Sequence, residues 1–253
     1  MGLARGSDCN KVRPRMPPST THPAPAPVEK PAWAHIDTVL LDLDGTLLDL
    51  AFDNYFWLEL IPCAYAASRS LTTDEARTLL TPRFRAREGT LAWYCVEHWS
   101  RELGLDVLAL KRNVAQRVAW LPGAEGFLRT LRAAGKRVVL ITNTHPRVLE
   151  IKAERTGVTG YFDAVFCSHQ FGFPKEHPRF WEAVQAVEPF DRERTLFVDD
   201  SPPVLRAARA AGIRWIYGVR RPCVNCDEPQ RIVREHGEIP AVDSVSDLAP
   251  ASL

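Results

Sequence analysis

Thr-Val-Leu-Leu-Asp-Leu-Asp-Gly-Thr, residues 38–46, is the stretch that decides the fold of this chain. Residues 38–43 form a short, mostly apolar run, and Asp44-Gly45 is a turn-forming pair, so the pattern predicts a buried strand ending in a loop. Two carboxylates, Asp42 and Asp44, then stand at the carboxyl end of that strand. Taken alone, both could be ordinary turn residues, because Asp-Gly is common in turns.

After Pro122-Gly123 the chain alternates between apolar strands and helices, several of which stop at a glycine. The expected strands are 137–142, 164–167, 195–199 and 214–217, and the expected helices are 124–134, 146–155, 178–187 and 203–211. Strands without polar alternation, separated by helices, indicate a parallel sheet covered on both faces. We therefore predict an α/β fold with a Rossmann-like parallel sheet.

Residues 52–120 show no strand-like alternation and are rich in Ala, Leu and aromatic residues. Helices are expected at 54–68, 74–88, 91–103 and 107–120, which predicts an all-helical cap inserted after the first strand. The expected organisation is a disordered Pro-rich tail (1–31), a core (36–51 and 121–219), the cap (52–120) and a C-terminal extension (220–253).

The composition is that of an ordinary globular protein. The 253 residues carry 32 Lys+Arg and 31 Asp+Glu, a net charge of +1, which argues against binding nucleic acid or a membrane surface by bulk electrostatics. There is neither an apolar run long enough to span a membrane nor an apolar signal-peptide core, so we expect a cytoplasmic protein, translated from Met1 or Met16.

The six cysteines are scattered through a chain large enough to fold without disulfides, so reduced thiols are expected. Cys223-x-x-Cys226 forms a close pair. Structural zinc sites usually need four ligands, and His236 is the one histidine downstream of this pair, so two free thiols are the favoured interpretation over a metal site.

In open parallel sheets, ligands bind beyond the carboxyl ends of the strands. This edge would collect several polar side chains: Asp42, Asp44, Thr142, Asn143, Lys175, Asp199, Asp200 and Ser201. Four carboxylates repel one another unless a cation neutralises them, and a site with oxygen ligands alone favours Mg²⁺. A metal, a lysine and a hydroxyl around a carboxylate are suited to phosphoryl transfer, in which the carboxylate attacks phosphorus.

These motifs, in this order, resemble those of the haloacid dehalogenase superfamily of phosphatases: DLDGT at 42–46, ITN at 141–143, Lys175, and VDDS at 198–201. The wider stretch LDLDGTLLDLAFDNYFW at 41–57, with WYC at 93–95 and FGFPKEH at 171–177, resembles the bacterial GMP/IMP 5′-nucleotidases of that superfamily. The resemblance covers roughly residues 36–219 and implies both the fold predicted above and a helical cap over the site.

The resemblance also implies catalytic roles. Asp42 would be the nucleophile, and Asp44 the general acid that protonates the leaving oxygen and then activates water. Thr142 and the backbone N–H of Asn143 would hold the oxygens of the transferring phosphoryl group. Lys175 would stabilise their charge and that of the nucleophile.

The implied Mg²⁺ ligands are Asp42, the backbone carbonyl of Asp44, and Asp200. Asp199 stands where many relatives have glycine. It is either a further metal ligand or a residue that caps the helix after Pro202-Pro203, and the sequence leaves both open.

Cap residues should select the substrate, because the catalytic edge contacts only phosphate and metal. Trp93, Tyr94 and Phe56 are candidates to stack on a purine, although cap aromatics are more often core. We expect Mg²⁺-dependent hydrolysis of purine nucleoside 5′-monophosphates, GMP and IMP, through an aspartyl-phosphate. Alternatives are a phosphatase for a sugar phosphate or other small metabolite, and a non-catalytic binding protein on the same fold. The sequence leaves the oligomeric state open.

Overall fold

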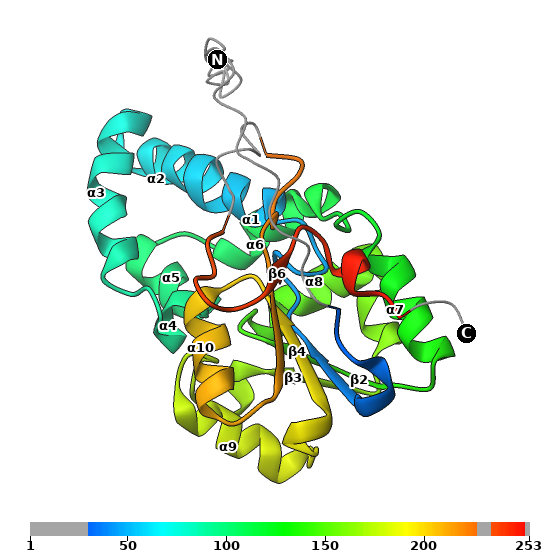
Figure 1. Ribbon diagram of the computed structural model, residues 1–253. Helices are drawn as coiled ribbons and strands as arrows, with labels where there is room; N and C mark the ends of the chain where they lie inside the picture. Colours follow the sequence, from blue (N-terminus) through cyan, green and yellow to red (C-terminus); the bar gives the residue numbers. More distant parts are fainter. Residues whose placement is uncertain (1–29, 227–233, 251–253) are drawn as a thin grey trace.

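Six parallel strands form the central sheet of the computed structural model, in the order β3-β2-β1-β4-β5-β6 (Figure 1). The structure describes residues 30–226 and 234–250. The strands are β1 (Thr38–Leu41), β2 (Arg137–Thr142), β3 (Ala164–Cys167), β4 (Thr195–Asp199), β5 (Trp215–Val219) and β6 (Ala241–Val242). The Rossmann-like parallel sheet predicted from the sequence is confirmed.

Helices cover both faces of this sheet. They are α7 (Ala124–Ala133), α8 (Pro146–Thr156), α9 (Pro178–Val187) and α10 (Pro202–Ala210). In β1, Leu40 packs with buried residues of α9 and α10, whereas Val39 and Leu41 pack with those of α7. This division follows from the strand geometry, in which successive side chains point to opposite faces.

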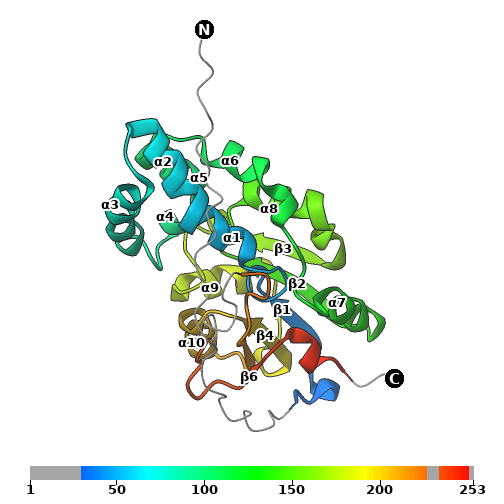
Figure 2. The same cartoon turned by 90° about the horizontal axis from the view of Figure 1, so that it is seen from above.

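An all-helical cap lies between β1 and β2 in the sequence and above one end of the sheet (Figures 1 and 2). Its helices are α1 (Ala51–Tyr55), α2 (Ile61–Arg69), α3 (Thr73–Arg85), α4 (Leu91–Tyr94), α5 (Val96–Leu103) and α6 (Val107–Asn113), and a π-helical turn, Phe56–Leu60, joins α1 to α2. Val148 and Ile151 of α8 belong to the buried cluster that forms the cap's core, so the cap packs directly on the sheet domain.

Two expected cap helices are shorter than predicted. The helix expected at 91–103 breaks at Cys95, whose extended backbone (φ −88°, ψ 113°) ends α4 and begins α5. The helix expected at 107–120 ends at Asn113, because the chain returns to the sheet and Trp120 pairs there with Leu48. In both places tertiary contacts override the local helical pattern.

The segment after Arg220 contributes more to the core than the sequence suggested. The strand β6 extends the sheet, and Val245 and Leu248 are fully buried against α7. The expectation of an extension outside the core is therefore wrong for this part, and a two-residue strand is too short to give a periodic signal.

Trp33 donates a hydrogen bond from Nε1 to the Leu248 carbonyl (2.9 Å), so packing begins before Ile36. The disordered tail predicted at 1–31 lies almost entirely outside the described residues.

A disulfide joins Cys223 to Cys226, so the expectation of two free thiols is wrong. The physical reason is the turn between them: the Asp49 carboxylate accepts hydrogen bonds from the backbone N–H groups of Val224 (3.3 Å) and Asn225 (3.0 Å). These bonds fold the intervening residues and bring the two sulfurs together.

In the part of the chain that the structure describes, no helix is long and apolar enough to cross a bilayer.

The burial of the C-terminal segment predicts a large effect of Leu248→Ala. Truncating this fully buried side chain should lower the free energy of unfolding by about 2–5 kcal/mol, through lost burial and a residual cavity. Chemical denaturation would measure it, with Leu79→Ala as the matched control because Leu79 is 46% exposed. Equal stabilities of the two variants would contradict the assignment of this segment to the core.

Candidate active site

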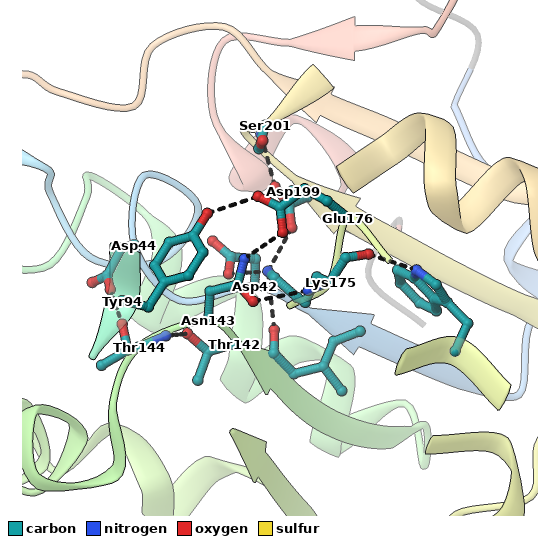
Figure 3. Close-up of polar contacts among 12 residues, drawn as sticks. Asp42, Asp44, Tyr94, Thr142, Asn143, Thr144, Lys175, Glu176, Asp199 and Ser201 are labelled. Carbon is teal, nitrogen blue, oxygen red and sulfur yellow. Dashed lines mark hydrogen bonds and ion pairs between the residues drawn. The ribbon is translucent and has the colours of Figure 1, made fainter. Parts of the chain in front are cut away.

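Strand ends and one loop bring the predicted site residues together at the carboxyl edge of the sheet. Asp42 follows β1, Thr142 ends β2 and Asp199 ends β4. Lys175 arrives from the loop between β3 and α9, and its side chain points at the two aspartates (Figure 3). The edge predicted from motif order is therefore present as one compact group.

Lys175 is the central cation of this edge and is only 1% exposed. Its Nζ donates hydrogen bonds to Asp42 Oδ1, to Asp199 Oδ2 (2.7 Å) and to the Ile141 carbonyl (3.3 Å). Burial alone would lower the pKa of Lys175, but Asp199 and Asp42 outweigh it and raise the pKa above its ordinary value. The ammonium group is therefore fixed and charged beside Asp42.

Asp199 makes hydrogen bonds through both of its oxygens. Its Oδ2 accepts from Lys175, and its Oδ1 accepts from the backbone N–H of Ser201 (2.7 Å) just before α10. The residue that caps α10 is Ser201, so the interpretation of Asp199 as a helix cap is wrong. We infer that Asp199 positions Lys175, and its role as a further metal ligand stays a prediction.

Three buried carboxylates, those of Asp42, Asp199 and Asp200, have oxygens within 4.8 Å of one another. Burial raises the pKa of Asp42 to about 6, with Lys175 opposing and Asp199 adding to the rise. Burial and the neighbouring Asp199 also raise the pKa of Asp200 well above its ordinary value. An excess of buried negative charge with oxygen donors fits a hard divalent cation, so this cluster could hold a metal ion.

Gly45 keeps the loop after Asp44 close to this cluster. Its φ of +83° favours glycine, and a Cβ at this position would lie 2.7 Å from Asp200 Cγ and 2.9 Å from Pro222 Cβ. The Asp-Gly pair is therefore required both by the turn and by the close approach of Asp200 to the backbone.

Asp44 is two residues after Asp42 but is held by a second group of charges. Lys152 on α8 donates to Asp44 Oδ1 (2.6 Å) and to Asp53 Oδ2 (2.7 Å), and Lys111 of the cap donates to Asp53 Oδ1 (2.7 Å). The hydroxyl of Thr144 donates to the other oxygen of Asp44. Burial raises the pKa of Asp44 while Lys152 opposes it, which suits a group that must carry a proton during part of the reaction.

Thr142 and Asn143 are fixed in place by their neighbours. The Thr142 hydroxyl accepts from the Thr144 backbone N–H (3.0 Å). The Asn143 amide accepts from the Lys175 backbone N–H (2.9 Å) and donates to Glu176 (3.0 Å). The Asn143 side chain therefore organises the loop that carries Lys175, which leaves phosphate binding to its backbone.

A cavity of about 530 Å³ runs from this edge into the cap. Trp57, Phe84, Trp93 and Tyr94 form its aromatic wall. Trp93 stacks on Trp57 with ring centroids 6.2 Å apart, and the Tyr94 hydroxyl donates to Glu176 Oε1 (2.7 Å), so the wall is tied to the catalytic edge (Figure 3).

Phe56 does not belong to this wall. It is 0% exposed and packs inside the cap, so the proposal that it contacts substrate is wrong on geometric grounds. Sequence alone could not separate it from Trp57, its neighbour, which does line the cavity.

Sequence reasoning missed Lys152, Lys111 and Asp53, which hold Asp44. One signal was present: the chain has six lysines against 26 arginines, and three of the six are buried around this site. Arg234 was also missed; its Nε lies 3.3 Å from Asp200 Oδ2 at the mouth of the cavity.

Comparisons with known proteins agree with this arrangement. A family model of haloacid dehalogenase-like hydrolases matches residues 36–212. The chain is 44% identical over 199 residues to the GMP/IMP nucleotidase YrfG of Escherichia coli, covering 79% of this chain and 90% of that protein. It is 28% identical over 188 residues to a phosphoglycolate phosphatase of Mesorhizobium japonicum, covering 69% and 79%. The crystal structure of a HAD phosphatase from Thermococcus onnurineus superposes with a TM-score of 0.70 at 20% identity, covering 84% and 96%.

The contacts of Lys152 predict a selective catalytic defect in Lys152→Met. Asp44 would lose the cation that fixes it, so kcat/KM for an alkyl phosphate should fall by about 100-fold, while kcat/KM for p-nitrophenyl phosphate, whose leaving group needs no proton, falls by less than about 10-fold. Steady-state kinetics on both esters would measure the difference. Lys136→Met is the control, since Lys136 bonds the carbonyls of Trp33 and Ile36, remote from the site. Equal losses of kcat/KM on both esters would contradict a role of Lys152 in protonation of the leaving group.

The crowded carboxylates predict that Asp200→Asn stabilises the metal-free protein. Burial raises the pKa of the Asp200 carboxyl in the folded protein, whereas in the unfolded chain the pKa is about 4. The free energy of unfolding therefore falls as the pH rises from the unfolded pKa through the folded one. Removing that group should raise the Tm in chelator at pH 8 by about 2–4 °C and abolish the rise caused by Mg²⁺. Thermal unfolding at pH 5 and 8 would measure this, with exposed Asp74→Asn as control. A variant with a lower Tm in chelator that still responds to Mg²⁺ would contradict the account.

Proposed function

Since this chain belongs to the haloacid dehalogenase-like hydrolase family and is a phosphatase, we propose that it hydrolyses purine nucleoside 5′-monophosphates, GMP and IMP, in a Mg²⁺-dependent reaction. The observation that carries the proposal is the single cavity that joins the catalytic edge to the aromatic wall of the cap. Its volume of about 530 Å³ lies in the range of sites for molecules of nucleotide size. The 44% identity to a GMP/IMP nucleotidase supports the same substrate class.

In the proposed first step, an Asp42 oxygen attacks phosphorus, the bond from phosphorus to the 5′ oxygen breaks, and Asp44 gives its proton to that oxygen. Lys175 holds Asp42 Oδ1, so the attack falls to the other carboxylate oxygen. In the second step Asp44 takes a proton from water, the water oxygen attacks phosphorus, and the bond to Asp42 breaks to release phosphate. The same carboxyl thus acts as acid and then as base.

The residues fit Mg²⁺ at the cluster of buried carboxylates. Asp42, Asp200 and the backbone carbonyl of Asp44 would hold it, and when bound it would neutralise the carboxylates and the phosphoryl oxygens. Thr142 and the backbone N–H of Asn143 would bind those phosphoryl oxygens, and Lys175, paired with Asp42 and Asp199, would balance the remaining charge.

The residues that line the cavity support purine selection. Trp93 and Phe84, which pack edge to face, line it, as do Arg85 and Glu88. Guanine and hypoxanthine share a donor at N1–H and an acceptor at O6, which a carboxylate and a guanidinium can bind. Adenine has the reverse pattern at both atoms, so contacts from Glu88 and Arg85 would favour GMP and IMP over AMP.

A phosphatase for a small metabolite is the second candidate, because phosphoglycolate phosphatases are about 28% identical to this chain. A substrate panel distinguishes the two. With Mg²⁺, kcat/KM should be higher for GMP and IMP than for AMP, pyrimidine nucleotides, sugar phosphates and phosphoglycolate. Highest activity on phosphoglycolate or a sugar phosphate would overturn the proposal in favour of the second candidate.

Trp93→Leu should separate substrate recognition from folding. Loss of a stacking face should lower kcat/KM for GMP about 10- to 100-fold, and that for p-nitrophenyl phosphate much less, because the smaller ester does not reach the wall. Phe56→Leu is the matched control, since this core aromatic should lower stability and affect both substrates alike. Equal losses of kcat/KM for GMP and for p-nitrophenyl phosphate in Trp93→Leu would contradict a stacking role for Trp93.

A further inference from the structure

A second group of metal-ligating side chains lies outside the acidic cluster, where the cap meets the sheet domain. Cys95 and Glu97 stand at the junction of α4 and α5. His145 precedes α8, in the loop after β2, and His169 lies in the short turn Ser168–Gln170 after β3. Three metal-ligating side chains from three separate segments therefore meet, and Glu97 lies beside two of them.

The distances within this group suit a single ion. The ligand atoms of Cys95, His145 and His169 all lie within 4.8 Å of one another. Glu97 lies beside two members of the group: its Oε2 is 2.9 Å from His145 Nε2 and 3.5 Å from Cys95 Sγ. The centroids of the two imidazole rings are 4.6 Å apart, with an angle of 77° between the ring planes.

Hydrogen bonding within the group does not explain the environment of the His169 ring. Both of its ring nitrogens are buried and have no hydrogen-bond partner among the described residues. A neutral imidazole has one N–H donor and one acceptor, so the acceptor nitrogen of His169 is available to a ligand that the described residues do not supply.

We propose that Cys95, Glu97, His145 and His169 bind one Zn²⁺ ion. A thiolate with two imidazoles is a softer donor set than the oxygen ligands of the catalytic edge, and it selects Zn²⁺ over Mg²⁺. On binding, the Cys95 thiol gives its proton to solvent and the sulfur forms the metal bond. The His98 backbone N–H already donates to Cys95 Sγ (3.4 Å) at the start of α5, a contact that holds the sulfur in place.

Binding through His145 Nε2 would make Nδ1 the protonated nitrogen. The present contact from the Arg147 backbone N–H to Nδ1 (3.4 Å) would then be released. That contact is at the long limit of a hydrogen bond, so its loss does not oppose the ion strongly. Glu97 in turn would exchange its contact with the His145 ring for the metal.

The position of the ion assigns it a structural role. Its ligands come from the cap on one side and from the loops after β2 and β3 on the other. Tyr94, adjacent to Cys95, reaches Glu176 at the catalytic edge. The zinc would therefore fix the aromatic wall of the cavity relative to Lys175 and leave the bond-making steps to the acidic edge.

Metal analysis tests the proposal without any activity measurement. Full-length protein, purified without chelator and dialysed against excess Mg²⁺, should retain about one zinc per chain by mass spectrometry of its metal content. Cys95→Ser and His169→Ala should each lose at least about 90% of it. Substituting Co²⁺ should give a thiolate-to-metal charge-transfer band that disappears in Cys95→Ser, and circular dichroism would show that each variant is folded.

Matched controls localise the ion. His177→Ala alters an exposed histidine that begins α9 in the same His-Pro-Arg context, and Cys63→Ser alters another cap cysteine; both should keep the zinc. The double variant Cys223→Ser/Cys226→Ser should also keep it. Zinc-free wild-type protein that takes up no Zn²⁺ on titration would overturn the proposal, as would zinc retained in folded Cys95→Ser and His169→Ala.

Discussion

The contact of Lys175 with Asp42 and Asp199 is the interaction on which the rest of the site depends. An unpaired charge inside a protein is strongly unfavourable, so a buried ammonium and two buried carboxylates are tolerated only as a group. Pairing fixes the geometry: Asn143 and Trp181 bond the backbone of Lys175, and Ser201 bonds Asp199. Asp42, the proposed nucleophile, therefore stands in a preorganised electrostatic environment before any substrate arrives.

A second buried group links this edge to the cap. Lys152 comes from the sheet domain, Asp53 and Lys111 come from the cap, and together they hold Asp44. Lys111 also lies over the rings of Phe52 and Phe56, which adds cation–π attraction inside the cap core. Ion pairs as well as apolar packing thus join the cap to Asp44, the proposed acid–base residue. A shift of the cap would therefore change the position of the Asp44 carboxyl.

The spacing of the motifs was sufficient to predict the parallel sheet and the edge that collects Asp42, Asp44 and Lys175, because strand order places the carboxyl ends together. It was insufficient for Lys152 and Asp53, since their meeting depends on how α1 packs against α8. Phe56 and Trp57 are adjacent aromatics, and only the turn of the helix sends one into the core and the other to the cavity. The strand β6 was missed because two residues give no periodic signal, and the disulfide was missed because the turn between its cysteines is bonded by Asp49, which is distant in sequence.

Transfer of the phosphoryl group to Asp42 is the central claim, and direct trapping tests it best. Enzyme mixed with GMP and Mg²⁺ and quenched within one turnover should carry an acyl phosphate at residue 42. Borohydride reduces an acyl phosphate to an alcohol, so peptide mass spectrometry should find the Asp42 side chain reduced, in an amount that depends on substrate. Reduction at another carboxylate, or none at any residue while GMP is still hydrolysed, would contradict the account.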